Sequence, residues 1–184
     1  MYFTLINDNQ LETDKYLNEP EDLPVELSFI RGDMITMDVQ VPMVFSTNAK
    51  KGDELRHFLR SSVPIMSKQF VELLQGAGVD NLQVFPAEVK SEVDGYVWPD
   101  YYAVNVMGLI SCANLEKSDY AEIMPGHYRF RELAIDADKA KDALLFRLQE
   151  HSPTIIIHES VCQYLVDNDP DDKLTGWSVG DIDQ

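Results

Sequence analysis

Two stretches of the chain share one pattern, and this likeness constrains the fold more than any other feature of the sequence. In VPIMSKQFVELL (Val63–Leu74) and TIIIHESVCQYL (Thr154–Leu165), a short apolar run meets a polar residue, after which apolar residues recur at helical spacing. The polar residue is Ser67 in the first stretch and His158 in the second. Low identity leaves open whether the likeness is a duplication or a recurring unit. In either case it predicts an α+β fold with two similar strand–helix–strand corners.

Apolar runs elsewhere predict further strands of a mixed or antiparallel sheet. They lie at Tyr2–Ile6, Val25–Ile30, Val41–Phe45, Leu82–Val89, Tyr101–Met107, Tyr128–Ile135, Leu144–Leu148 and Leu174–Val179. Residues 17–24 predict a loop, and residues 53–60 have the apolar spacing of a helix. Residues 138–143 predict a brief helix with Asp136 or Asp138 as its cap.

The strand at Tyr101–Met107 contains two adjacent tyrosines, which raises the question of a ligand platform. Alternation places Tyr102, Val104 and Val106 on one face, which is expected to be core. The other face is mixed and carries Tyr101, Ala103, Asn105 and Met107. Because aromatic and β-branched residues suit a pleated, half-buried surface, a central strand is expected here.

The length and the cysteine count predict an ordinary soluble domain. The chain has 184 residues, enough to bury a core without covalent staples, and no linker rich in proline, glycine or serine divides it. One domain is therefore expected over residues 1–184, with residues 63–179 as its core and residues 1–62 as a less defined N-terminal portion. Two cysteines make a disulfide framework unexpected. The absence of a secretory signal and of a long apolar run predicts a cytoplasmic protein.

The charge excludes some partners and favours others. Thirty-two acidic and 15 basic residues leave a net charge of −17, whereas solubility needs a magnitude of only about 2 to 8. The excess repels nucleic-acid phosphate and anionic lipid, so neither is expected as a direct partner. It favours rapid capture of a basic partner, although solubility alone is an equally good explanation of the charge.

Known catalytic and metal-binding motifs are absent from the sequence. There is no G-x-S-x-G, no P-loop and no G-x-G-x-x-G. His158 and Cys162 stand four residues apart on a predicted helix, where they could hold a metal or form a nucleophile pair. No second Cys/His pair lies nearby, and Cys162 takes the apolar place that Val71 has in the first stretch. A buried structural thiol is therefore expected, with no metal, cofactor or catalytic residue.

The segment DNDPDDKLTGWS (residues 167–178) begins like a calcium loop. Asp167, Asp169 and Asp171 stand at alternate positions. A calcium loop of this kind has glycine at its sixth position and glutamate at its twelfth. Here those positions hold Asp172 and Ser178, so an acidic loop after a helix is expected.

Several short motifs follow one another in a set order. They are VFPAEV (Val84–Val89), YYAVNVMGLISC (Tyr101–Cys112), RELAIDADKAKDALLFRL (Arg131–Leu148), IIIHESVCQYL (Ile155–Leu165) and LTGWSV (Leu174–Val179). Together they resemble the immunity protein family numbered eleven of bacterial polymorphic-toxin systems, over about residues 63–179. The chain departs from that family at His158, where the family usually has serine, at Ser111-Cys112 in place of an aspartate, and at the final aromatic pair, here Trp177 and Val179.

The resemblance implies a protein that binds and neutralises a cognate toxin, usually encoded by the neighbouring gene, and it implies no catalytic residue. A basic toxin, such as a nuclease, would fit the acidic charge. Two other hypotheses are kept. One is a small-molecule-binding or regulatory domain with a pocket between the two corners, lined by Trp98 and Tyr101. The other is an enzyme that uses His158 and Cys162.

The toxin-binding surface is expected among acidic loops and nearby aromatic residues, because interface anchors are often aromatic. The candidate residues are Asp94, Tyr96, Trp98, Asp100, Asp119, Asp167, Asp169, Asp171 and Asp172.

Overall fold

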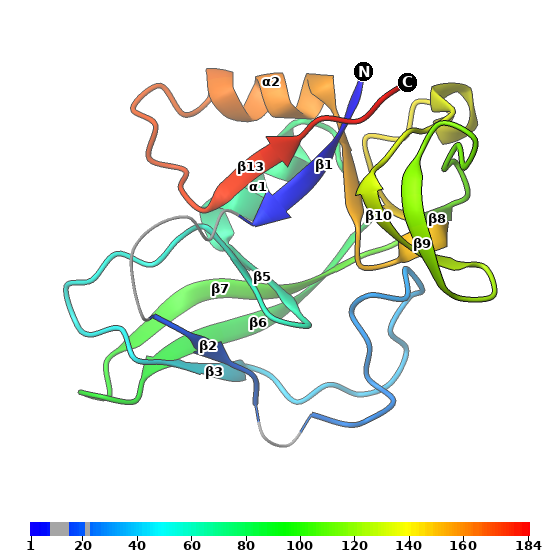
Figure 1. Ribbon diagram of the computed structural model, residues 1–184. Coiled ribbons are helices and arrows are strands. Elements are labelled where there is room, and N and C mark those ends of the chain that lie inside the picture. The colour runs from blue at the N-terminus through cyan, green and yellow to red at the C-terminus, as the bar shows by residue number, and fades with distance from the viewer. Residues whose placement is uncertain (8–14, 21–22) are drawn as a thin grey trace.

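The computed structural model describes residues 1–7, 15–20 and 23–184. Its fold is mixed α+β, as predicted, with two large mixed sheets and two α-helices (Figure 1). The five-stranded sheet has the order β13 (Trp177–Gly180), β1 (Tyr2–Asn7), β12 (Ile155–His158), β11 (Leu145–Leu148) and β8 (Leu109–Ile110). The six-stranded sheet has the order β2 (Leu17–Asn18), β3 (Met43–Thr47), β6 (Leu82–Ser91), β7 (Val97–Val106), β5 (Pro64–Ser67) and β4 (Phe58–Arg60). Strands β9 (Asp119–Met124) and β10 (His127–Glu132) form a separate hairpin.

The two predicted corners are confirmed. β5 leads directly into α1 (Lys68–Gly76), and β12 leads directly into α2 (Glu159–Asp167). The polar residue at the end of each strand is the N-cap of the helix. Ser67 Oγ accepts a hydrogen bond from the Phe70 N–H at 3.1 Å, and His158 Nδ1 accepts one from the Ser160 N–H at 3.3 Å. The first N–H groups of a helix have no partner within the helix. The polar side chain at the end of each apolar run supplies an acceptor for one of them.

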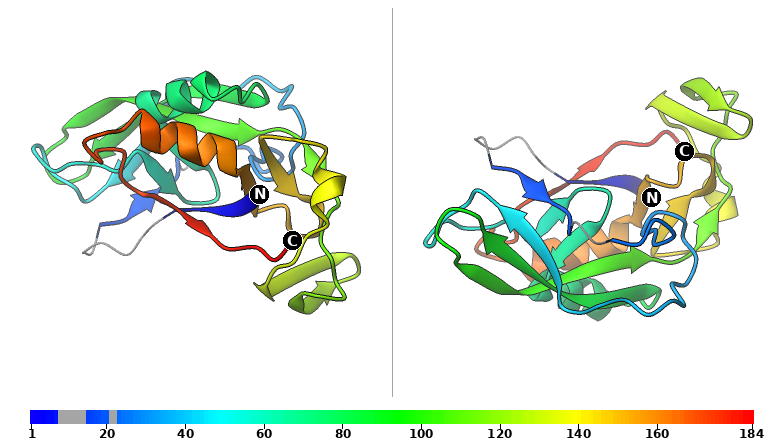
Figure 2. Two further views of the ribbon diagram at one scale, coloured as in Figure 1. Left: turned by 90° about the horizontal axis from the view of Figure 1, so that it is seen from above. Right: turned by 90° about the horizontal axis from the view of Figure 1, so that it is seen from below.

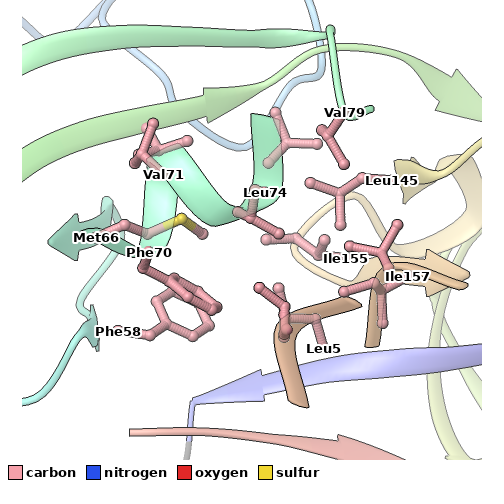
Figure 3. Packing of buried hydrophobic residues seen from close by; sticks show 14 of the residues in the cluster. Leu5, Phe58, Met66, Phe70, Val71, Leu74, Val79, Leu145, Ile155 and Ile157 are labelled. Atoms are coloured by element: carbon pink, nitrogen blue, oxygen red, sulfur yellow. The ribbon is translucent and has the colours of Figure 1, made fainter. Parts of the chain in front are cut away.

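A central cluster of buried hydrophobic side chains packs the two sheets against the two helices (Figure 3). Phe70 and Leu74 from α1 and Leu165 from α2 are fully buried within it. The sheets contribute Leu5, Phe58, Met66, Val104, Val106, Leu145, Ile155 and Ile157. Each such side chain contributes about 1.5–3 kcal/mol when it is removed from water, so this cluster holds the two corners together.

Both faces of β7 are buried, where the sequence predicts one core face and one mixed face. β7 is a central strand, as predicted, and lies between β6 and β5. Tyr101 and Ala103 pack into a second cluster on the far face of the six-stranded sheet. Asn105 on that face is fully buried, and its Nδ2 donates to the backbone oxygen of Asp33 at 2.8 Å and to Gln83 Oε1 at 3.2 Å. The irregular segment of residues 23–42 covers this face, which the pattern within the strand cannot reveal.

The strand predicted at Val25–Ile30 is wrong, and this stretch is a turn and bends. The Leu27 N–H donates to the backbone oxygen of Pro24 at 2.9 Å. Phe29 is buried in the second cluster. The alternation of apolar and polar residues at Val25–Ile30 therefore belongs to an irregular segment whose apolar side chains pack on the six-stranded sheet. Within the residues predicted as a loop, 17–24, Leu17–Asn18 form the short strand β2.

The helix predicted for residues 53–60 is also wrong, because the described backbone ends this stretch in β4. Phe58 belongs to the central cluster, whereas Leu55 and Leu59 pack against the second cluster. Leu55 lies before β4, and Phe58 and Leu59 are consecutive residues of β4 that point to opposite faces of the sheet. The three residues therefore do not share one helical face.

Several other boundaries differ from prediction, among them those of β3 (predicted as Val41–Phe45) and β7 (predicted as Tyr101–Met107). The strand predicted at Tyr128–Ile135 ends at Glu132, and Ile135 forms an isolated bridge with Ala113. The brief helix predicted for residues 138–143 is the 3₁₀ turn η1 (Ala137–Ala140). Asp136 occupies the N-cap position but makes no capping hydrogen bond with its side chain. Its carboxylate instead contacts Lys139 Nζ at 2.7 Å.

Arg147 on β11 is the largest fully buried side chain among the described residues. Its Nε donates to the backbone oxygen of Val106 at 3.2 Å, at the end of β7. Nη1 donates to the oxygen of Ser152 at 2.9 Å, just after the 3₁₀ turn η2 (Gln149–His151), and Nη2 donates to the oxygen of Phe29 at 2.6 Å. A guanidinium presents its N–H groups as a planar fork. One side chain therefore joins both large sheets and the irregular segment.

Arg147→Lys is expected to lower the free energy of unfolding by about 3 kcal/mol, because a single ammonium cannot reach three separate carbonyls and leaves some of them buried without this donor. Urea unfolding measures the loss. The matched control is Arg129→Lys at an exposed position of β10, which should stay within about 0.5 kcal/mol of the parent. Equal effects of the two substitutions would contradict the role given to Arg147.

Gly176, in the LTGWSV motif of the sequence, lies where the chain returns from α2 to β13. Its φ is +90°. Asn7 Nδ2 donates to the backbone oxygens of both Phe58 and Gly176 at this junction. A Cβ on Gly176 would lie 2.8 Å from the Phe58 oxygen and 2.5 Å from Arg56 Cβ. Only glycine fits both the backbone angle and the space.

Gly176→Ala is expected to destabilise the protein by about 3 kcal/mol, from the positive φ and the contact with the backbone together. The control is Gly52→Ala, where φ is +93° but no atom lies within 4 Å of the added Cβ. That control should cost only the backbone contribution of about 1 kcal/mol. The difference between the two unfolding free energies measures the close packing at Gly176, and a difference near zero would refute it.

Candidate protein-interaction surfaces

The turn between β6 and β7 and the start of β7 hold four of the predicted site residues, Asp94 and Tyr96 in the turn and Trp98 and Asp100 in the strand. The rings of Tyr96 and Trp98 meet edge to face, with centroids 4.9 Å apart. Asp94 is part of the turn itself, because its carboxylate accepts hydrogen bonds from the N–H groups of Lys51 at 2.9 Å and Tyr96 at 3.1 Å. These bonds, the one from Lys51 first, lower the pKa of Asp94. Asp94 therefore orders the turn, and Trp98 is half-buried against the second cluster.

The acidic loop, Asp167–Asp172, follows α2 and is held by its own backbone. Asp169 Oδ1 accepts from the Lys173 N–H at 3.0 Å, and Asp169 Oδ2 accepts from the Leu174 N–H at 2.6 Å. Asp171 contacts Lys173 Nζ at 2.6 Å in an exposed ion pair. Lys173 is the single lysine or arginine among residues 148–184, so the field of this loop is strongly negative.

Asp119 lies apart from the other predicted residues. It begins β9 and contacts Arg131 at 3.6 Å in an ion pair that is exposed on both sides. The β6–β7 turn and the acidic loop lie toward one end of the molecule, and the β9–β10 hairpin lies at the other (Figures 1 and 2). The structure therefore distributes the predicted site over three places.

Sequence reasoning missed the β9–β10 hairpin as a surface element. Every residue of β9 is exposed. Ile123 and Met124, adjacent on this strand, are 58% and 56% exposed. The signal was present in the sequence, because the Pro125-Gly126 pair marks a turn between two alternating runs. Gly126 adopts a φ of +79° there.

His57 links the acidic loop to the first corner. Its Nδ1 lies 2.7 Å from the hydroxyl oxygen of Ser67, the N-cap of α1. Its backbone N–H donates to the oxygen of Thr175 at 2.9 Å. Burial lowers the pKa of His57, and this effect outweighs the attraction of Asp169, a hydrogen bond with the backbone of Lys173 and the attraction of Glu54. The folded state therefore favours the neutral imidazole.

The pair His158 and Cys162 has no arrangement for nucleophilic chemistry. His158 caps α2, and its Nδ1 lies 2.8 Å from Ser160 Oγ. Burial raises the pKa of Cys162 to about 11, so the thiol stays protonated near neutral pH. Burial likewise raises the pKa of Cys112 to about 12. Among the residues that the structure describes, no three His, Cys, Asp or Glu side chains are placed to hold a metal ion.

The space between the two corners is filled by the central cluster. Tyr101, which the pocket hypothesis places in the lining, is buried, and its hydroxyl donates to the backbone oxygen of Arg56 at 2.9 Å. A shallow pocket of about 160 Å³ lies elsewhere, along the irregular segment between Glu26 and Met37. Ligand pockets commonly have about 300–1,000 Å³, so this one is too small for a typical metabolite.

Comparison with known families gives the decisive observation. The sequence profile described as Immunity protein family (Imm11) matches residues 5–184. The chain belongs to this immunity protein family. No curated protein matches the chain. Membership in Imm11 implies a toxin as the partner.

The family match extends the resemblance seen in the sequence toward the N-terminus. It begins at residue 5, within β1. β1 pairs with both β12 and β13 in the five-stranded sheet, so the N-terminal portion is part of the same structure as the C-terminal motifs. Within the described part of the chain, no helix has the length and apolar character needed to span a membrane.

The lowered pKa of His57 predicts a pH dependence of stability. Between that lowered pKa and the ordinary value of 6.5, the unfolded chain binds more protons than the folded one. The free energy of unfolding is therefore highest, as far as His57 is concerned, above about pH 6.5, and it declines as the pH falls from 6.5 toward the lowered pKa. Urea unfolding from pH 7.5 to pH 5 should show a smaller decline for His57→Asn than for the parent. The control is His127→Gln, on the exposed hairpin, and an unchanged decline in His57→Asn would contradict the prediction.

Proposed function

We propose that this Imm11 protein binds a cognate toxin one to one and neutralises it by covering the surface that the toxin uses. The observation that carries the proposal is membership in an immunity protein family over residues 5–184. The toxin is a basic domain encoded by an adjacent gene, and capture takes place in the cytoplasm of the cell that produces the pair. The immunity protein itself performs no catalysis.

The charge of the chain supports a mechanism of capture. An immunity protein must reach its toxin before the toxin reaches its target, so the association rate matters. A net charge of −17 attracts a basic partner over about 8–10 Å at physiological salt. Such steering raises association rates toward about 10⁸–10⁹ M⁻¹s⁻¹ at low salt, compared with about 10⁵–10⁶ M⁻¹s⁻¹ without it.

The acidic loop is the best placed source of this attraction. Asp167, Asp171 and Asp172 are exposed, and Lys173 offsets only one carboxylate. Asp94 and Asp100 extend the negative potential to the β6–β7 end of the molecule, whereas Asp119 on β9 is offset by Arg131. Tyr96 and Trp98 provide a secondary contact at the β6–β7 turn. Exposed charges of this kind change the rate of encounter more than the lifetime of a complex.

The chemistry of the remaining candidates supports binding over catalysis. The two thiols have pKa values raised to about 11 and about 12, and His158 is engaged as a helix cap. An enzyme would need an activated group in an open cleft. An inhibitor that acts by occlusion needs only a stable scaffold with an exposed complementary surface.

We expect the protein to co-purify with the catalytically inactivated C-terminal domain encoded by the adjacent gene. The complex should be nanomolar or tighter, and stopped-flow measurements should show an association rate that falls steeply between low and high salt. Asp171→Asn/Asp172→Asn should slow association several-fold with little change in dissociation. Tight binding that is insensitive to salt would keep the immunity function but reject charge steering. Failure of the two proteins to associate would reject the immunity function.

A further inference from the structure

The β9–β10 hairpin stands apart from both large sheets and extends from one end of the molecule (Figures 1 and 2). Its two strands pair only with each other in the described chain, with Ala121 opposite Arg129 and Tyr120 opposite Phe130. An isolated two-stranded hairpin is marginally stable in water. The hairpin must therefore be held by contacts of one face with the body of the protein.

The inner face of the hairpin makes those contacts. Tyr120, Tyr128 and Phe130 share this face, and their ring centroids lie 5.0–6.2 Å apart. Phe130 also packs against a third cluster, formed on the outer face of the five-stranded sheet around Phe146 and Ile156. Phe130 therefore anchors the hairpin on the body of the protein, and Tyr120 and Tyr128 pack against it.

The outer face is left to solvent and has a different chemistry. Ala121 and Arg129 pair across the two strands and lie on this face, and Ile123 lies next to them at the register shift between the Tyr128–Glu122 and His127–Met124 pairs. Ile123 is 58% exposed, and Met124, which lies beside the turn, is 56% exposed. Arg129 is exposed and has no ion-pair partner among the described residues. Arg131 makes only the exposed 3.6 Å pair with Asp119, and pairs of this kind contribute little.

Exposed apolar side chains next to an arginine are typical of the centre of a protein–protein interface. Methionine and arginine are enriched at protein interfaces, and arginine is frequent among the residues that dominate binding energy. A projecting element has the shape to enter a recess. By contrast, the β6–β7 turn uses Asp94 for its own backbone and half-buries Trp98.

The charge of the outer face runs against that of the whole molecule. The chain has a net charge of −17, yet this face presents the guanidinium group of Arg129 and, paired with Asp119, that of Arg131. A uniformly basic partner surface would repel them. The partner surface that complements both features is basic around its rim and carries carboxylates where the hairpin enters.

We propose that the β9–β10 hairpin is the element that enters the toxin, with Ile123 and Met124 in an apolar recess and Arg129 against carboxylates in its wall. This inference rests on the proposed function. The acidic loop then raises the association rate of the two proteins, and the hairpin lowers the dissociation rate of the complex. A second copy of the chain is a poor occupant, because two molecules of charge −17 repel each other.

The test compares two hairpins within one protein. Arg129→Glu and Ile123→Ser change the β9–β10 hairpin. Lys90→Glu and Val93→Ser make the same chemical changes at the β6–β7 end, where Val93 is 56% exposed and Lys90 is also exposed. All four sites are at the surface, so thermal unfolding should show that each variant folds. The probe is the inactivated C-terminal toxin domain encoded by the adjacent gene.

Arg129→Glu is expected to weaken binding about 100-fold and Ile123→Ser about tenfold, mainly through faster dissociation. Lys90→Glu and Val93→Ser should stay within about twofold. Losses at Lys90 and Val93 with none at Arg129 and Ile123 would overturn the inference and make the β6–β7 turn the anchor. Equal weakening by both charge reversals would show that only net charge matters and would also overturn it.

Two outcomes separate this inference from the function on which it rests. If the unsubstituted protein does not bind the toxin domain, the proposed function fails and the inference fails with it. If the unsubstituted protein binds but the hairpin variants bind equally well, the function stands and the inference alone fails. A dimer in sedimentation velocity that Ile123→Ser abolishes would assign the hairpin to self-association and overturn the proposal.

Discussion

The buried guanidinium of Arg147 is the interaction on which the arrangement of the two sheets depends. It lies on β11 and donates to backbone oxygens at the end of β7, after η2 and in the irregular segment. An uncompensated buried charge costs several kcal/mol, so the protein is stable only when these three segments come together around it. Asn81 Nδ2 supports the same junction through the backbone oxygens of Met107 and Leu145. These directional bonds hold β11 against the end of β7 and the irregular segment.

Several motifs of the sequence have a structural role, at this junction or elsewhere in the fold. The Phe-Arg pair of β11 places Phe146 in the third cluster and Arg147 in the junction. The polar residue before α2 is a helix cap, so His158 can stand where serine is usual because its Nδ1 also accepts a hydrogen bond. Gly176 is required by its positive φ and by the nearby backbone of Phe58. These positions maintain the fold.

The proposed division of labour follows from where the scaffold leaves charge and apolar surface. The helices and the two large sheets bury their apolar side chains in three clusters. What stays outside is a negative potential that is strongest after α2 and a hairpin whose outer face is apolar and basic. A long-range field and a short-range anchor act at different stages of association. Placing them on different elements lets each change without disturbing the core that both share.

The sequence by itself determined the local structure and the class of function. Helical and strand periodicity identified both corners and β7 as a central strand, because these features depend on neighbours along the chain. The structure then showed that the polar residues Ser67 and His158 cap the two helices. The ordered motifs identified the family. Only the tertiary structure decided that Phe29 covers a sheet from an irregular segment, that Phe58 and Leu59 separate to opposite faces of a strand, and that Arg147 is buried. Each of these depends on a partner distant in sequence, and no local pattern specifies which surface a side chain will meet. For the same reason the sequence did not show which face of the β9–β10 hairpin is exposed, because that depends on the contact of Phe130 with the third cluster.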